Sequence, residues 1–491
     1  MRKLTVAALA CLLAVSSFTR AQAMISRFQH IIVVVQENRT PDDLFQGLCL
    51  PPYGDPSACG SELGQFDIQG FGFDARGNKV ALAPVPLGNG YDPAHGHSDF
   101  EKMCNPNRMT YYPCTRNTQL STAGCPANCS FEYVDPTMQP TIYPYLYMAQ
   151  TFGWANRMFQ TNQGPSAPAH QFLFAGTSAP SSAEDAGAVF VSENNGVLGC
   201  LSPLNSVYLM IDPARAPGQF DLVNNPQGTT CFSRDTMASL LEQYGYRWRY
   251  YTTGFPATHV SNSIWTAPNW IQEICQPNST FTACTGREWL DNVDENPPDI
   301  LRDLQNCNLK DMVWVIPKGQ YSDHPSSTTK QSNDGGPAWV ANVVNAVSGS
   351  PCVDQVNGAR VPYWADTAIV VTWDDWGGFY DHVLPPFLSP PRQGQGDYQL
   401  GFRVPLIFIS AYTVPIIDSV NQYDFGSILR FVEGNFGIHE GALGFADQRS
   451  STNLRAFYNF LQPPKKFVIP TKVPASFFLN DTRPAEPPDI D

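Results

Sequence analysis

The stretches HIIVVVQEN (residues 30–38) and AIVVTWDD (residues 368–375) decide the fold of this chain. Each is an apolar, β-branched run that stops abruptly at acidic or amide side chains, which is typical of a buried strand in a parallel sheet. In an open α/β sheet, the active site lies at the carboxyl ends of the strands. Because the two runs start more than 330 residues apart, they predict a site that the fold assembles from distant segments.

The rest of the chain predicts strands that alternate with helices. Apolar runs predict strands at 30–35, 246–252, 312–316, 368–372 and 404–410. Helical patterns cover 143–160, with a bend at Gly153, and 168–176, 235–244 with Asp235 as N-cap, 336–347 and 426–436. This alternation predicts an α/β fold with a mostly parallel central sheet and helices on both faces.

Three further segments differ from this pattern. Residues 1–23 read as a secretory signal, with a basic start, a short apolar core and an Ala-Gln-Ala cleavage site. Residues 48–135 form a Cys-rich loop insertion within a domain expected over 24–461. Residues 462–491 are Pro-rich and predict a loose C-terminal tail. The chain is therefore expected to be exported, to the periplasm or the medium.

Composition limits the partners. The formal net charge is −14, and removal of three basic signal residues takes it to about −17. Such an acidic chain argues against nucleic acid as a partner. No apolar stretch after the signal is long enough to be a transmembrane segment.

The cysteines indicate disulfide bonds. Twelve of the 13 cysteines remain after the signal, and an even number in an exported chain favours bridges over metal binding. Their pairing does not follow from the sequence. They are Cys49, Cys59, Cys104, Cys114, Cys125, Cys129, Cys200, Cys231, Cys275, Cys284, Cys307 and Cys352.

Oxygen donors follow both decisive strands. Glu37-Asn38 and Asp374-Asp375 offer the ligands that hard divalent cations prefer. Adjacent residues of a strand face opposite ways, so both aspartates reach one ion only if the chain kinks, and Gly377-Gly378 permits this. The alternatives are a capped turn and a solvated acidic loop. Neither explains acidic groups beside buried aromatic residues.

Ser166 is the candidate nucleophile. It follows Gly164-Pro165 at the expected start of a helix, where backbone N–H groups and the helix dipole favour a phosphate. A hydroxyl there can attack phosphorus when a cation or base activates it. The alternative is an ordinary N-cap serine.

Histidine is scarce, with eight in the chain. His95 and His97 lie in the loop DPAHGHSDF, and His324 lies in YSDHPSS. A histidine in a polar loop can bind a phosphoryl group or protonate a leaving oxygen. His170, in the first turn after Ser166, could also touch the site, and His30 could be a packing residue.

Three segments carry a specific resemblance. HIIVVVQENRTPDDLF (30–45), NQGPSAPAHQFLFAG (162–176) and VTWDDWGGFYDHVLPP (371–386) resemble signatures of the bacterial phosphoesterase family. That family includes acid phosphatases and phosphatidylcholine-hydrolysing phospholipases C. The resemblance implies an alkaline-phosphatase-like α/β fold. Two departures, Thr40-Pro41 for Ser-Phe and Ala169-His170 for Asn-Arg, concern the shape of the substrate pocket.

The resemblance also implies roles for the candidate residues. Glu37, Asn38, Asp374 and Asp375 would hold a divalent metal ion, which could be Ca, Mg, Mn or Zn. Ser166 would be both nucleophile and metal ligand. His324 and one of His95 and His97 would bind the phosphoryl group or protonate the leaving oxygen, and His259 matches a further site histidine only weakly.

The sequence thus predicts a metal-dependent hydrolase that acts on a small phosphate ester or a phospholipid through a phosphoserine. The chain lacks the C-terminal β domains of the long phospholipases, which favours an acid-phosphatase-like enzyme. A phospholipase C is the first alternative. A non-catalytic surface protein that uses the metal for stability is the second. Sulfatase chemistry is disfavoured, because Ser-Ala-Pro-Ala-His lacks the Ser-Arg that follows a sulfatase nucleophile.

Overall fold

The computed structural model describes residues 25–486 with gaps. The gaps are positions 75, 89, 105–125, 194–198, 214, 216–217, 225–229, 255–263, 326–334 and 389–397. The expected signal (1–23), His259, Cys114 and Cys125 therefore lie outside the described residues.

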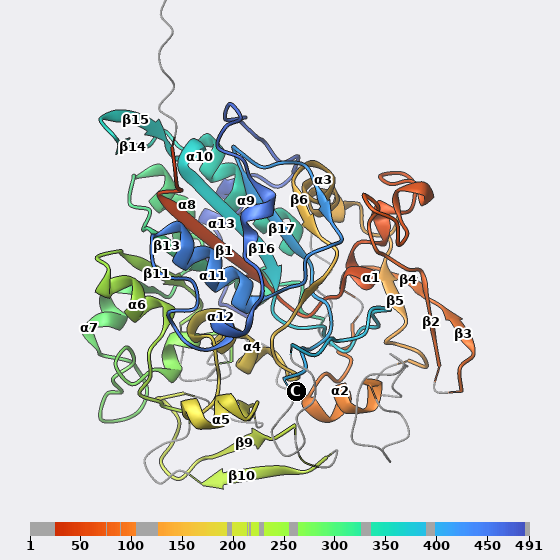
Figure 1. Cartoon of the computed structure of the whole chain (residues 1–491), viewed down its shortest axis with the longest axis horizontal. Coiled ribbons are helices and arrows are strands. Elements are labelled where there is room, and N and C mark those ends of the chain that lie inside the picture. The colour runs from red at the N-terminus through yellow and green to blue at the C-terminus, as the bar shows by residue number, and fades with distance from the viewer. Residues whose placement is uncertain are drawn as a thin grey trace, which may run out of the picture.

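An eight-stranded sheet forms the centre of the molecule (Figure 1). Its order is β12 (Val293–Asp294), β11 (Trp248–Tyr251), β13 (Met312–Val315), β1 (His30–Gln36), β16 (Thr367–Trp373), β17 (Leu406–Ser410), β6 (Gly153–Ala155) and β18 (Ile417–Asp418). All neighbouring strands are parallel except β17, which runs antiparallel to both β16 and β6. The predicted mostly parallel sheet is confirmed.

Two groups of helices cover the sheet (Figure 1). One group holds α3 (Tyr143–Thr151), α8 (Asp299–Gln305), α9 (Gly336–Gly349), α10 (Tyr363–Asp366) and α13 (Ala475–Leu479). The other holds α4 (Ser166–Ala175), α6 (Met237–Gln243), α11 (Phe425–Asn435) and α12 (Ala446–Arg449). β1 and β16 lie between them with every residue buried, which explains their unbroken apolar sequences.

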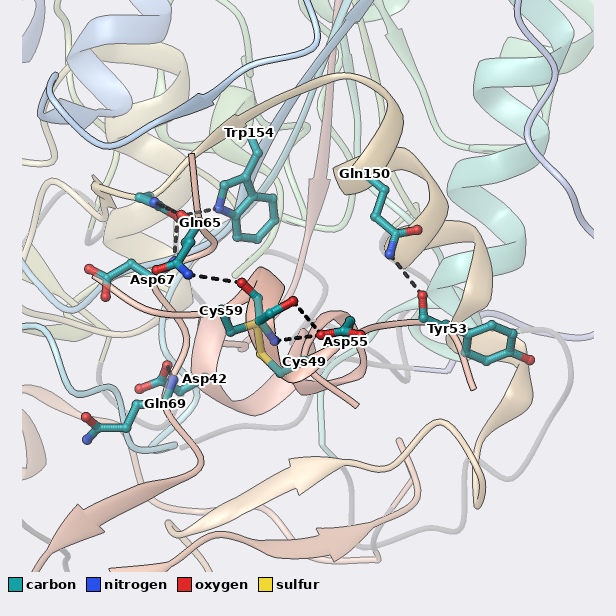
Figure 2. The surroundings of a disulfide bond; sticks show 12 residues. Asp42, Cys49, Tyr53, Asp55, Cys59, Gln65, Asp67, Gln69, Gln150 and Trp154 are labelled. Carbon is teal, nitrogen blue, oxygen red and sulfur yellow. Dashed lines mark hydrogen bonds between the residues drawn. A yellow bond between two sulfur atoms is a disulfide. The ribbon is translucent and has the colours of Figure 1, made fainter. Parts of the chain in front are cut away.

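The insertion wraps one edge of this core. It follows η1 (Gln46–Leu48) and contains η2 (Pro56–Ala58), β2 (Phe71–Phe73), β3 (Lys79–Ala81), β4 (Ala83–Val85), α2 (His97–Cys104) and β5 (Glu132–Val134). The Cys49–Cys59 disulfide closes its first loop (Figure 2). Beside it, the side-chain amide of Gln150 on α3 donates to the Tyr53 carbonyl at 3.0 Å, which ties the loop to the core (Figure 2).

Smaller elements complete the described chain. β8 (Phe190–Ser192), β9 (Val207–Ile211) and β10 (Phe220–Asn224) form an antiparallel sheet, as do β14 (Val353–Val356) and β15 (Ala359–Pro362). β7 (Met158–Phe159) pairs with β19 (Tyr423–Asp424). The remaining helices are α1 (Pro41–Leu44), η3 (Pro140–Ile142), α5 (Ser182–Ala186), η5 (Ala267–Trp270), α7 (Arg287–Asn292), η6 (Gly319–Tyr321), η7 (Leu454–Phe457). Disulfides join Cys200 to Cys231, Cys275 to Cys284 and Cys307 to Cys352.

Two helix predictions need correction. The helix expected over 143–160 ends at Thr151, and Gly153 begins strand β6 instead of bending a helix. A Cβ at Gly153 would lie 2.5 Å from the Phe457 ring, so close packing explains the glycine. The helix expected over 235–244 is capped by Thr236 and not by Asp235, because Thr236 and Ser239 form a capping box.

The C-terminal segment is not loose where it is described. Phe467, Ile469 and Phe478 are buried, and α13 packs against α8 and α9. Asn345 exchanges two backbone–side-chain hydrogen bonds with Ile469. Apolar residues between the prolines thus dock this segment on the helix layer.

No helix in the described part of the chain combines the length and the apolar character that crossing a membrane requires.

Candidate active site

The two decisive strands end at the same level. β1 and β16 are parallel neighbours, and their last paired residues are Gln36 and Trp373. Glu37-Asn38 and Asp374-Asp375 follow directly, and all four side chains are fully buried. The Asn38 N–H donates to Asp374 Oδ1 at 2.9 Å, so the two strand ends are joined by a hydrogen bond.

Tight turns aim these side chains. Asn38 adopts a left-handed φ of 62°, and Gly377 one of 60°. Asp374 Oδ1 also accepts from the Asp375 N–H at 2.7 Å, and Asp375 Oδ1 accepts from the Gly377 N–H at 2.7 Å. The chain therefore turns sharply after β16, and Gly377 lies at this turn because a left-handed φ costs glycine little.

Ser166 is the first residue of α4, and its hydroxyl faces the strand ends. Ser166 Oγ lies 3.1 Å from Asp375 Oδ2 and 3.4 Å from Asn38 Oδ1. The next residue, Ala167, donates its backbone N–H to the Glu193 carboxylate at 3.0 Å. The start of α4 thus already binds a carboxylate, as its dipole and exposed N–H groups favour.

His170 lies one turn after Ser166 on the same face of α4. Its Nε2 is 3.2 Å from Glu37 Oε1 and 3.7 Å from Asp374 Oδ2. Burial lowers the pKa of His170 to about 4, although the nearby aspartates oppose this, so the ring is neutral at neutral pH. From the sequence, His170 is only a possible neighbour of the site; its spacing of four residues from Ser166 is the signal that places it on the same helix face.

The electrostatics of this cluster fit a cation. Burial, and then the Glu37 carboxylate, raise the pKa of Asp374 well above its ordinary value. Arg39, the nearest arginine in sequence, points its guanidinium to Asp43 at 3.1 Å. Ligand atoms of Glu37, His170 and Asp374 lie within 4.8 Å of one another. Clustered buried carboxylates with a neutral imidazole are a donor set for a divalent cation.

His95 and His324 approach this cluster from two other loops. His95 Nδ1 donates to the Pro93 carbonyl at 2.7 Å, so its Nε2 accepts from the Asn38 side-chain amide at 2.7 Å. The His324 ring lies 5.9 Å from the His95 ring, and its Nδ1 donates to the Pro325 carbonyl. The Pro325 carbonyl thus engages Nδ1, not Nε2, of His324.

His97 makes different contacts from His95. It begins α2 instead of lying in a loop, as the sequence had suggested. Its Nδ1 donates to the Gln163 carbonyl at 2.8 Å, and its Nε2 lies 3.6 Å from Glu101. Among the described residues its recorded contacts include none with the strand-end donors. The geometry therefore favours His95 over His97.

The His324 loop is held by the strand ends themselves. The Gln36 side chain accepts from the Asp323 N–H at 2.9 Å, and the Trp373 indole donates to Asp323 Oδ2 at 3.0 Å. Tyr145 OH donates to the same carboxylate oxygen at 2.7 Å. The last residues of β1 and β16 thus position both the oxygen donors and His324.

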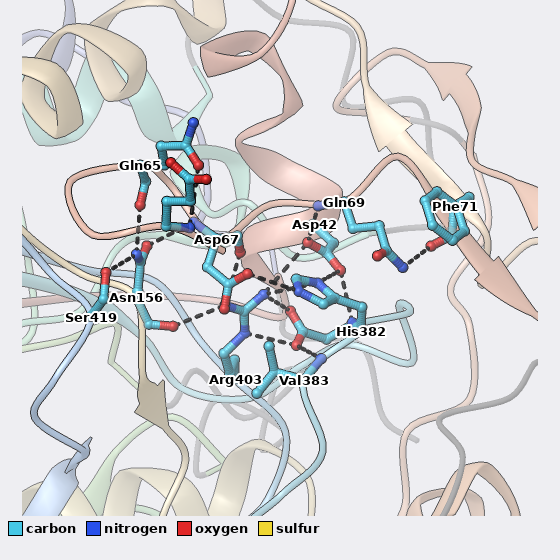
Figure 3. Close-up of polar contacts among 12 residues, drawn as sticks. Asp42, Gln65, Asp67, Gln69, Phe71, Asn156, His382, Val383, Arg403 and Ser419 are labelled. Atoms are coloured by element: carbon cyan, nitrogen blue, oxygen red, sulfur yellow. Dashed lines mark hydrogen bonds and ion pairs between the residues drawn. The ribbon is translucent and has the colours of Figure 1, made fainter. Parts of the chain in front are cut away.

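A second buried network holds the loop that follows Asp374-Asp375 (Figure 3). The Arg403 guanidinium pairs with Asp381 at 2.8 Å. His382 lies between Asp42, at 2.7 Å from Nδ1, and Asp67, at 3.1 Å from Nε2. This network joins α1, the insertion, the turn after β16 and the segment before β17, and so ties the loop after Asp374-Asp375 to three other segments.

A third cluster lies at the other end of β1. His30 Nε2 is 2.7 Å from Asp354, and Asp366 lies beside them. Burial, and then Asp354, raise the pKa of Asp366 to about 9. A strand of seven residues spans about 20 Å, so this cluster is remote from Glu37. His30 also packs on Tyr363, with ring centres 4.7 Å apart, which agrees with a packing role.

A profile of the phosphoesterase family matches residues 28–439 of the chain, well over half of its length. The chain belongs to the phosphoesterase family. The match covers the strand ends, Ser166 and all the described histidines discussed above.

Named relatives of this phosphoesterase include two bacterial proteins. Phospholipase C B of Mycobacterium tuberculosis is 26% identical over 292 residues, which cover 55% of this chain and 52% of that protein. Hemolytic phospholipase C of Pseudomonas aeruginosa is 23% identical over 496 residues, covering 91% of this chain and 58% of that protein. The chain thus spans little more than half the length of these curated relatives.

Similar solved structures include a Vibrio parahaemolyticus protein described as a member of the alkaline phosphatase superfamily. It is 12% identical, covers 62% of each chain and has a TM-score of 0.31. The assignment of this phosphoesterase to its family comes from the sequence match.

Proposed function

We propose that this phosphoesterase hydrolyses phosphate esters with Ser166 as the nucleophile. The observation that carries the proposal is the Ser166 hydroxyl, 3.1 Å from the Asp375 carboxylate at the carboxyl ends of β1 and β16. Asp375 is positioned to accept the hydroxyl proton as the oxygen attacks phosphorus. The leaving alcohol departs and a phosphorylated Ser166 forms; water then restores Ser166 and releases phosphate from a monoester substrate or a phosphomonoester from a diester substrate.

The site residues divide the work. Glu37, Asn38, Asp374, Asp375 and Ser166 would hold a divalent cation, which when bound would lower the pKa of the hydroxyl and offset charge on the phosphoryl oxygens. His324 Nε2 is the candidate donor of a proton to the leaving oxygen. His95, fixed between Pro93 and Asn38, orients the Asn38 amide.

The substrate class has two candidates. The relatives named above are phospholipases C, which favours a phospholipid head-group ester. The acid-phosphatase-like interpretation of the sequence favours a small monoester. The four described disulfides suit an oxidising compartment, which supports export to the periplasm or the medium.

The test is Ser166→Ala, assayed on an aryl phosphomonoester, an aryl diester and phosphatidylcholine vesicles. The variant should lose about 10³-fold or more in kcat on every substrate that the wild type cleaves. Ser178→Ala is the matched control, because Ser178 is a buried serine near the other end of α4 that donates to the Val191 carbonyl. It should keep near wild-type turnover.

A second measurement tests the intermediate. Acid quenching of wild-type turnover of the aryl phosphomonoester, followed by mass spectrometry, should find a phosphate on the peptide that contains Ser166. Wild-type rates in Ser166→Ala would refute the nucleophile. A wild-type protein that binds cations but cleaves none of the three substrates would favour the non-catalytic alternative, in which the cation only stabilises the fold.

A further inference from the structure

Helix α4 presents two polar side chains to the two strand ends. Ser166 faces Asn38 and Asp375, and His170, four residues later, faces Glu37 and Asp374. Residues four apart lie on one face of a helix, so both side chains belong to a single surface. The five donors assigned above therefore have a sixth neighbour on the same helix.

The surroundings of His170 suit a ligand better than a packing residue. The side chain is about 1% exposed, and its Nδ1 has no hydrogen-bond partner among the residues that the structure describes. Its Nε2 lies 3.2 Å and 3.4 Å from the two oxygens of Glu37 and 3.7 Å from Asp374. A polar ring is thus buried and aimed at two acidic groups.

The spacing of these atoms matches a coordination sphere. Bonds of about 2.0–2.2 Å from Zn²⁺ to nitrogen and oxygen ligands place neighbouring ligand atoms about 2.8–3.6 Å apart, from octahedral to tetrahedral geometry. The observed separation of 3.2 Å lies within this range, and that of 3.7 Å lies at its upper limit. An imidazole nitrogen favours borderline cations such as Zn²⁺, whereas an all-oxygen set favours Ca²⁺ or Mg²⁺.

We infer that His170 is an additional ligand of the cation site and makes this site select Zn²⁺-like cations over Ca²⁺ and Mg²⁺. The inference rests on the proposed function, because it concerns the same cation. It adds a nitrogen donor to the oxygen donors and so names the class of metal that this chain takes.

The test measures metal binding without turnover. Chelator-treated wild type and His170→Gln are titrated with Zn²⁺ and with Ca²⁺ by calorimetry. The variant should bind Zn²⁺ about 100-fold more weakly and Ca²⁺ within about threefold of wild type. His439→Gln, which removes an exposed imidazole, is the control and should leave both affinities unchanged.

A spectroscopic readout makes the test independent of how well the variant folds. Wild type loaded with Cu²⁺ should show pulsed electron paramagnetic resonance modulation from an imidazole nitrogen, and His170→Gln should lose it. Wild type without this modulation, or equal Zn²⁺ affinity in folded His170→Gln, would overturn the inference and leave the proposed reaction intact. Wild type that binds neither cation would overturn the metal assignment as a whole.

Discussion

His382 supports the turn after Asp374-Asp375, and its charge gives a measurable stability effect. Burial opposes the charged ring, but the Asp42 carboxylate and hydrogen bonds to Asp42 and Asp67 outweigh burial and raise the pKa of His382 to about 10. Asp381 and Arg403 are the other charged groups beside it. The ordinary pKa of histidine is 6.5.

The magnitude and the sign follow from linkage. The difference between pKa 6.5 and about 10 corresponds to about 5 kcal/mol, at about 1.4 kcal/mol for each pH unit. Because the pKa is raised in the folded state, this stabilisation is fully present below pH 6.5 and is lost as the pH rises through 10. Between pH 6 and pH 9 the loss is about 3 kcal/mol.

The assay is urea unfolding of wild type and His382→Gln at pH 6 and pH 9, with the disulfides intact. The difference in unfolding free energy between the two proteins should shrink by about 3 kcal/mol over this range. His439→Gln should show no such pH-dependent difference. If the difference in unfolding free energy between wild type and His382→Gln stays constant, or grows toward pH 9, the claim that Asp42 and Asp67 keep His382 protonated is refuted.

Other consequences of the site can be measured. Gly377→Ala should destabilise the protein by about 2 kcal/mol and reduce turnover, because φ at Gly377 is +60° and a Cβ would lie 2.3 Å from the Asn38 carbonyl oxygen. Gly349→Ala is the control: a Cβ there meets open space, so neither stability nor turnover should fall. Glu193→Gln should lower KM for an anionic phosphate ester about tenfold at unchanged kcat, since a neutral amide oxygen competes less strongly than a carboxylate for the Ala167 N–H; an unchanged KM would contradict this. Added Zn²⁺ at 100 times its Kd should stabilise the chelator-treated protein by about 2.7 kcal/mol, and an identical melting temperature would count against the cation site.

The sheet and its strand ends could be predicted from the sequence for a simple reason. Strands buried on both faces are continuous apolar runs, and β1 and β16 are such runs. Their register brings Gln36 and Trp373 to one level, so the polar residues that follow meet. The local sequence patterns suffice here because a single parallel pairing, between β1 and β16, brings the polar residues together.

Other features depend on contacts between distant segments. Gly153 begins a strand that pairs with β17 and β18, and the Phe457 ring leaves no room for a Cβ there; no local pattern encodes either contact. The choice of His95 over His97 depends on how the insertion folds back toward Asn38. The Pro-rich C-terminal segment looked unstructured locally, yet its spaced apolar residues, such as Phe478, dock on α9.

Helix α4 carries both Ser166 and His170, and the Trp314 indole of β13 anchors its far end by donating to the Leu173 carbonyl at 3.1 Å. The proposed nucleophile and the proposed metal ligand therefore lie on one helix that is hydrogen-bonded to the sheet. A packing change beneath α4 should alter metal affinity and reaction rate in proportion. Engineering that seeks a new substrate without disturbing either quantity should begin in the loops that carry His95 and His324.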